Sequence, residues 1–281
     1  MKLNVSANLT YEVISSSTII LNIHATRSKS QAILSESFKI DPYIEIEELI
    51  TLQGENRYIR FEVPEAATIN ITYNALIDTT FKKTEGKLLK DVPVMQLPPF
   101  VLPYLSPSRY CQSDKLYRFA NSRFGKIKNA FEKVLTLTNW IYENVEYLSG
   151  STNSETSAYD TVTEQAGVCR DFAHLGIALC RALSIPARYF TGYSYMLTPP
   201  DFHACFEAFL GGEWVLFDAT KLAPLNGMVK IATGRDAADT AIATIFGNIN
   251  CTAISANCAL AADKFRPFYY NGKTPRGLTY L

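Results

Sequence analysis

Three side chains of the types needed for nucleophilic catalysis lie in the second half of the sequence: Cys169, His203 and Asp218. A thiolate can attack an acyl carbon, and an imidazole can take the thiol proton and later protonate the leaving group. A carboxylate beside the imidazole fixes its tautomer and stabilises its charged form. We therefore treat Cys169 as the candidate nucleophile, His203 as the base and Asp218 as the residue that orients it, for acyl transfer through a thioester.

A helix is needed to position Cys169. Apolar residues recur at steps of three and four over residues 169–183, and a proline follows soon afterwards, which predicts a buried helix with Cys169 in its first turn. Free backbone amides and the helix dipole favour a thiolate at that end. Most free cysteines are small apolar core residues, and Cys180 on the same helix fits that description. Two polar residues, Arg170 and Asp171, directly follow Cys169, which argues against such a core role for Cys169.

A β-hairpin is expected to bring the other two residues together. Two alternating segments, residues 203–210 and 213–220, flank a Gly-Gly pair that suits a two-residue turn. The predicted cross-strand pairs run from Leu210 with Glu213, through Phe209 with Trp214, Ala208 with Val215, Glu207 with Leu216, Phe206 with Phe217, Cys205 with Asp218 and Ala204 with Ala219, to His203 with Thr220. This register gives one wholly apolar face and places His203 diagonal to Asp218 on the other, away from the core. A slip of one residue would mix the faces and separate His203 from Asp218.

The sequence also indicates the oxyanion donors, a helix that packs on the cysteine helix and a loop beside the site. The backbone amide of Cys169 is one expected donor to the oxyanion of a tetrahedral intermediate, and Gln165 and Trp140 are the candidates for the second donor. A helical pattern over residues 130–145 should pack on the cysteine helix. The polar loop at residues 149–157 is expected to border the substrate groove.

The N-terminal third of the chain is predicted to form an all-β unit. Residues 1 to about 86 contain several alternating segments of the kind that forms a small sandwich. His24 lies in one of them without a nearby cysteine or carboxylate, so we interpret it as a satisfied structural histidine in a strand. A proline-rich connector covers residues 92–107. We predict a β-sandwich-like domain at residues 1–95 and a catalytic domain at 96–281, with the α+β class overall.

Composition excludes several classes of function. The 281-residue chain has 27 basic and 27 acidic residues without a basic run, which argues against nucleic acid as a partner. No stretch approaches the roughly 18 apolar residues of a membrane span, and the N-terminus lacks a signal-peptide pattern, so we expect a cytoplasmic protein without a membrane partner. The six cysteines include no C-x-x-C pair. Reduced thiols, no metal site and no cofactor are therefore expected.

The sequence resembles the transglutaminase-like superfamily over roughly residues 105–250. The segment before it is similar to the N-terminal region of many bacterial members. The motifs that carry the resemblance are Gly167-Val-Cys169-Arg-Asp171-Phe-Ala, Ile185-Pro-Ala-Arg188, His203-Ala-Cys-Phe-Glu207 and Trp214-Val-Leu-Phe-Asp218. The resemblance implies a papain-like core with Cys169, His203 and Asp218 at the triad positions. Two residues depart from the family pattern: Cys205 stands where tryptophan is usual, and Ala219 where proline is usual.

Three classes of function remain open. The resemblance implies a cysteine peptidase or amide hydrolase that acts on a protein or peptide. The first alternative is a protein-glutamine transglutaminase, which transfers the acyl group to an amine and needs a site that excludes water. The second is a binding protein that has kept the fold without the chemistry. The sequence leaves the oligomeric state open.

Overall fold

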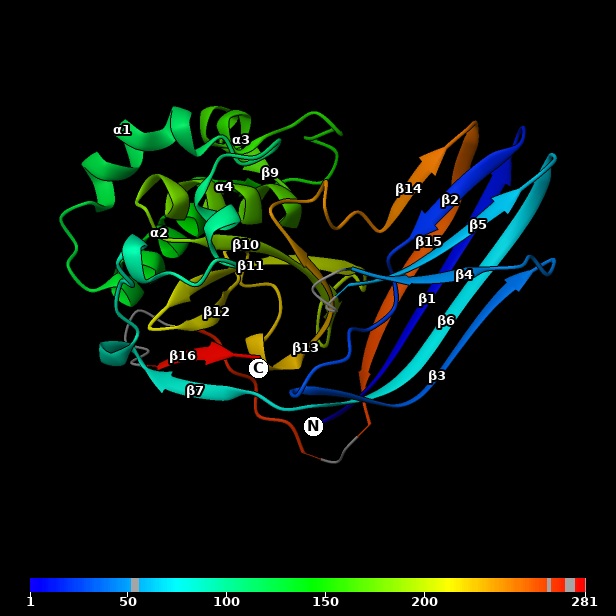
Figure 1. Cartoon of the computed structure of the whole chain (residues 1–281), viewed down its shortest axis with the longest axis horizontal. Helices are drawn as coiled ribbons and strands as arrows, with labels where there is room; N and C mark the ends of the chain where they lie inside the picture. Colours follow the sequence, from blue (N-terminus) through cyan, green and yellow to red (C-terminus); the bar gives the residue numbers. More distant parts are fainter. Residues whose placement is uncertain (52–55, 262–263, 271–275, 281) are drawn as a thin grey trace.

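The computed structural model describes residues 1–51, 56–261, 264–270 and 276–280. Within these residues, long antiparallel strands form one half of the molecule, and helices packed on a separate antiparallel sheet form the other (Figure 1). Strands and helices are thus segregated, which confirms the α+β class. Among the described residues, no helix has both the length and the apolar character needed to cross a bilayer.

Two four-stranded sheets enclose the core of the β-rich half. Their strand orders are β15-β1-β6-β3 and β14-β2-β5-β4. The strands are β1 (Lys2–Val13), β2 (Ser17–Leu21), β3 (Gln31–Asp41), β4 (Glu47–Ile50), β5 (Arg57–Val63), β6 (Ala67–Thr79), β14 (Ala243–Phe246) and β15 (Ile249–Leu260). Alternate residues of β1, β5 and β6 are buried, as the sequence pattern predicts for strands with one face on a core.

Two late strands complete these sheets. β15 pairs with β1 and β14 pairs with β2, so the chain returns to its N-terminal strands after it has built the other sheet (Figure 1). The segment at residues 235–242 makes this crossing. The domain division at residue 95 stays a prediction, but strands beyond that residue belong to the N-terminal sheets.

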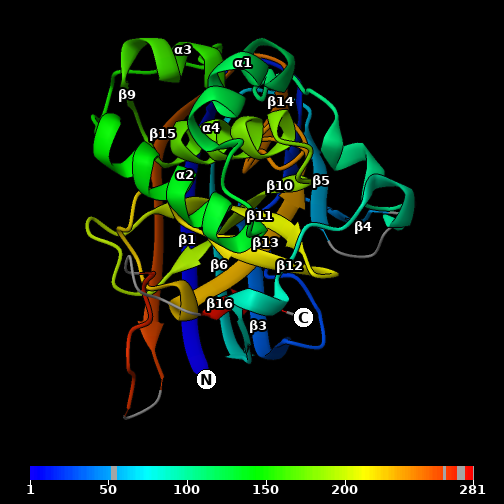
Figure 2. The same ribbon diagram turned by 90° about the vertical axis from the view of Figure 1, so that its left-hand side faces the viewer.

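The other half has helices over a sheet of order β12-β11-β10-β13 (Figure 2). Its elements are α1 (Ser113–Phe124), α2 (Ala130–Asn144), α3 (Ala158–Glu164), α4 (Cys169–Ala182), β10 (Ala187–Ser194), β11 (Phe202–Leu210), β12 (Glu213–Phe217) and β13 (Met228–Gly234). Shorter elements are β7 (Lys82–Glu85), β16 (Arg276–Thr279), β8 (Glu146–Tyr147), β9 (Ala166–Gly167), and the 3₁₀ turns η1 (Gly86–Leu88), η2 (Val94–Gln96), η3 (Leu102–Leu105) and η4 (Leu225–Gly227).

α4 is the central helix of this half and contacts α1, α2, α3, β10 and β11. Gly176 permits its close approach to β11, because a Cβ at that position would lie 2.4 Å from the ring of Phe206. The predicted helices over residues 169–183 and 130–145 are both present as α4 and α2, and they pack on one another.

The predicted hairpin register is confirmed for the five cross-strand pairs from Leu210–Glu213 to Phe206–Phe217. β12 ends at Phe217, so the ladder does not include the three pairs predicted beyond it. The expectation that one hairpin face points away from the core is wrong. Phe209 and Trp214, on that face, pack against Leu97 and Val101 of the proline-rich connector. Both faces of the hairpin are therefore covered.

Candidate active site

The turn before α4 is held by Asp171, which the sequence alone did not assign to this role. The Val168 N–H donates to Asp171 Oδ2 (2.9 Å), and Arg170 donates from Nε and Nη2 to Oδ1 (3.1 and 2.9 Å). Arg170 Nη2 also donates to the carbonyl of Asn153 (2.7 Å). The polar pair after Cys169 thus fixes the start of the helix and ties it to the neighbouring loop.

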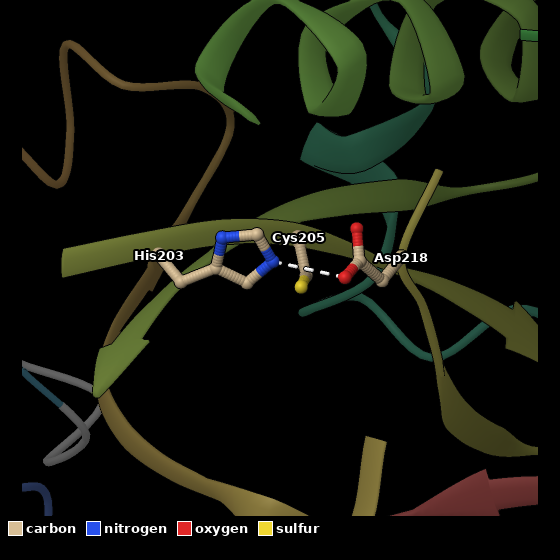
Figure 3. A group of neighbouring side chains, drawn as sticks. All are labelled: His203, Cys205 and Asp218. Carbon is tan, nitrogen blue, oxygen red and sulfur yellow. Dashed lines mark hydrogen bonds and ion pairs between the residues drawn. The ribbon is translucent and has the colours of Figure 1, made fainter. Parts of the chain in front are cut away.

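His203 and Asp218 form a buried hydrogen-bonded pair. His203 Nε2 lies 2.9 Å from Asp218 Oδ2 (Figure 3). Both side chains are almost fully enclosed. Thr220 donates to Asp218 Oδ1 from its backbone N–H (2.8 Å) and its hydroxyl (2.7 Å). The carboxylate is therefore held on one oxygen and presents the other to the imidazole.

The thiol of Cys169 lies beside His203 and adds to the raised pKa of the imidazole. Since Nε2 of the ring faces Asp218, Nδ1 is the nitrogen left for the thiol. Burial by itself opposes a charge on His203, yet the neighbouring Asp218 raises the pKa of the imidazole well above its usual value. Burial likewise opposes the charge on Asp218, and His203 nevertheless lowers the pKa of that carboxyl. The pair is thus set to carry opposite charges.

Cys169 opens onto a cleft of about 440 Å³ that His203 also lines. Cys169 is half-buried, whereas Asp218 stays behind the imidazole. Ser154 of the loop at residues 149–157 lines the cleft, as predicted. The segment at residues 235–242, which crosses between the two halves, supplies much of another wall.

Tyr147 is a functional candidate that the sequence did not reveal. β8 pairs in parallel with β9, which places Tyr147 opposite Gly167, two residues before Cys169. The Tyr147 hydroxyl lies close to the backbone amide and the thiol of Cys169, and both affect the pKa of the phenol. Burial and the nearby Cys169 raise the pKa of Tyr147. The hydroxyl is therefore a candidate oxyanion donor, and it lies in a strand too short for periodicity to predict.

Neither of the two residues proposed from the sequence for that donor is among the residues that line the cleft. Trp140 packs edge-to-face on Phe119 and Phe124, with ring centroids 5.1 and 6.2 Å apart. Gln165 ends α3 in a left-handed conformation with φ of 55°.

His174 on α4 supports the cleft from behind and was also missed. It is completely buried, its ring stacks on Tyr110 at 5.0 Å, and its Nε2 accepts a hydrogen bond from the Ala237 N–H (3.1 Å). Burial lowers the pKa of His174 well below its usual value, with Arg170 and Arg181 adding to the effect. The neutral imidazole of His174 thus holds the cleft wall in place at residue 237. The sequence signal that could have pointed to His174 was its position on the predicted helix, about one turn after Cys169.

Other candidate residues take structural roles. Glu207, a carboxylate on the same strand as His203, accepts from Arg188 Nε (2.6 Å) and Lys230 Nζ (3.2 Å). Burial raises the pKa of Cys180 and raises that of Cys205 to about 12, so both stay thiols. His24 is buried just beyond β2, not within a strand, and its Nδ1 has no hydrogen-bond partner among the described residues. The interpretation of His24 as a satisfied strand histidine is therefore wrong.

Comparison with known proteins agrees with this architecture. The family model described as bacterial transglutaminase, N-terminal domain, matches residues 1–100, and the transglutaminase-like superfamily model matches residues 118–219. A crystal structure from Cytophaga hutchinsonii, named a "Putative Cysteine Protease", is 56% identical with a TM-score of 0.98. The alignment covers 100% of this chain and 98% of that one.

Two mycobacterial proteins, both named as uncharacterized, are more distant. The Mycobacterium leprae protein is 26% identical over 49% of this chain, and the Mycobacterium tuberculosis protein is 34% identical over 31%. The match spans about half (52%) of the first protein and 28% of the second. Both family models, together with the full-length similarity to the Cytophaga protein, lead to one conclusion: the chain belongs to the transglutaminase-like superfamily.

Proposed function

We propose that the protein is a cysteine peptidase or amide hydrolase that forms a thioester on Cys169. The observation that carries the proposal is the buried His203–Asp218 hydrogen bond, with the Cys169 thiol beside the imidazole at an open cleft. The name of the Cytophaga protein, which is similar over the full length, supports the same class of reaction.

The mechanism follows from the positions of these groups. His203 accepts the thiol proton at Nδ1, and the resulting imidazolium is stabilised by Asp218 at Nε2. The Cys169 sulfur attacks the carbonyl carbon of the scissile amide. The Cys169 N–H and the Tyr147 hydroxyl donate to the oxyanion. His203 then protonates the leaving amine, the thioester forms, and water releases the acid product in a second cycle of the same steps.

Access of water to Cys169 favours hydrolysis over transfer to an amine. The sulfur-bearing residue is half-buried and lines the cleft directly, so water can reach a thioester at that position. Transamidation needs a site that delays water until an amine arrives. We therefore propose peptide or isopeptide hydrolysis as the main reaction and transglutamination as the alternative.

The test compares wild-type protein with Cys169→Ala on one bacterial lysate, with and without a fluorescent primary amine. Peptides are then identified by mass spectrometry. We expect new peptide termini with the wild type alone, and the same termini when the amine is present. Amine-tagged glutamines without new termini would instead support a transglutaminase. No product in either arm, with folded protein, would support a binding protein.

A further inference from the structure

Cys205 adds a third metal-ligand type to the His203–Asp218 pair. It follows His203 by two residues on β11, so both side chains leave the same face of the strand. One ligand atom from each of His203, Cys205 and Asp218 lies within 4.8 Å of the other two. Figure 3 shows the Cys205 sulfur beside the hydrogen bond between the other two side chains.

We propose that His203, Cys205 and Asp218 form an inhibitory site for a thiophilic divalent cation such as Zn²⁺. The inference rests on the proposed function, because it assigns a regulation to the same histidine. Tetrahedral zinc with bonds of about 2.0–2.1 Å to nitrogen and oxygen needs these atoms roughly 3.3 Å apart. His203 Nε2 and Asp218 Oδ2 are 2.9 Å apart, so the pair must open by only a few tenths of an ångström.

The ligand types also suit a thiophilic divalent cation. When Zn²⁺ enters, the Nε2 proton of His203 and the thiol proton of Cys205 leave to solvent, because both atoms must be deprotonated to bind the cation. Thr220 holds Asp218 through Oδ1, which keeps Oδ2 available for the cation. A thiolate and an imidazole together select zinc over hard cations such as Mg²⁺.

Binding at this site would stop catalysis without blocking the nucleophile. A cation on Nε2 takes the place of the Nε2 proton and of its hydrogen bond to Asp218. His203 then no longer forms the imidazolium that accompanies the thiolate. His203 lines the cleft, which gives the cation a route to the site.

The experiment uses full-length, chelator-washed protein and Co²⁺ as a spectroscopic substitute for Zn²⁺. Cys169→Ala is the first sample, because it retains all three ligands while it cannot carry out the proposed reaction. We expect one Co²⁺ per chain, with a thiolate-to-cobalt charge-transfer band, and displacement by Zn²⁺. The band should vanish in Cys169→Ala/Cys205→Ala and in Cys169→Ala/Cys205→Ser, and Zn²⁺ affinity should fall by more than about 100-fold.

Cys258→Ala is the matched control, since Cys258 is another buried thiol but lies in β15. It should keep the band. Far-ultraviolet circular dichroism checks folding, and the serine variant preserves the side-chain size if the alanine variant is unstable. Absence of a charge-transfer band in folded Cys169→Ala, or equal Zn²⁺ affinity with and without Cys205, would overturn the metal site. Neither result depends on activity, so failure of the proposed function is scored separately, by the lysate experiment.

Discussion

His174 is completely buried and His203 almost completely, yet their pKa values move in opposite directions. His174 accepts a backbone N–H and faces the cations Arg170 and Arg181, so its neutral form is favoured. His203 faces Asp218, whose charge outweighs the effect of burial. The same side chain is therefore a structural acceptor in one place and a proton carrier in the other. The nearby charges, more than the extent of burial, decide which.

The largest expected effect is that of Asp218→Asn. Without the carboxylate, the neutral form of His203 should be favoured, as it is in His174. Turnover should fall by about 10³–10⁴-fold, because an amide neither balances an imidazolium nor fixes the required tautomer. The fold should persist, since the side chains are nearly equal in size. Steady-state kinetics and ¹⁵N NMR of the three histidine rings measure both effects.

Glu207→Gln is the matched control for that change. It neutralises another buried carboxylate on the same hairpin, but one held by Arg188 and Lys230. We expect lower stability with His203 still protonated near neutral pH. Near-normal turnover in Asp218→Asn would show that Asp218 does not have the assigned role.

Tyr147→Phe should have the next largest effect. Removing one oxyanion donor typically lowers turnover by about 10²–10³-fold, and KM should change little because the donor acts on the transition state. Tyr117→Phe, at an exposed tyrosine of α1, is the control and should change neither constant. Equal losses in kcat and in substrate affinity for Tyr147→Phe would instead indicate a role in substrate binding.

The two histidines should also give opposite pH dependence of stability. The raised pKa of His203 contributes stability that is present below about pH 6.5 and is lost as the pH rises through the folded-state value. The lowered pKa of His174 contributes stability above about pH 6.5 that is lost on acidification. Denaturant unfolding of Asp218→Asn should therefore show a larger destabilisation at pH 5.5 than at pH 9, by up to about 3 kcal/mol. A loss that is independent of pH would argue against the His203–Asp218 ion pair.

The smallest effect is expected at His174. His174→Leu removes the acceptor for the Ala237 N–H and should cost about 1–3 kcal/mol of stability. Because residue 237 lines the cleft, KM should rise several-fold with kcat nearly unchanged. His174→Gln restores an acceptor, so it should recover part of both losses. A large fall in kcat would place His174 in the chemistry, contrary to our account.

Local sequence patterns were sufficient for the hairpin and the cysteine helix. Gly211 and Gly212 adopt φ of 60° and 87°, which suits the two-residue turn, and the apolar pairs admit one register. The same register brings His203 to Asp218. Each of these features depends on residues close together in the sequence.

Features that depend on distant residues were not predictable in this way. The connector covers Phe209 and Trp214 from more than 100 positions away, so alternation could not show that both hairpin faces are buried. β15 is largely exposed and joins β1 from the opposite end of the sequence. Tyr147 reaches Cys169 through a two-residue strand pairing, which leaves no periodic signal.

The central claim is that His203 holds Cys169 ready as a nucleophile, and alkylation of two cysteines in the same molecule tests it most directly. Cys251 is exposed and serves as the internal reference for Cys169. Chelator-washed protein is treated with iodoacetamide near pH 6, where an ordinary thiol of pKa about 8.5 reacts slowly, and both sites are followed by peptide mass spectrometry. We predict that Cys169 reacts at least about ten times faster than Cys251 in the wild type and at a similar rate to Cys251 in His203→Ala. Equal, slow reaction of both cysteines in the wild type would contradict the account.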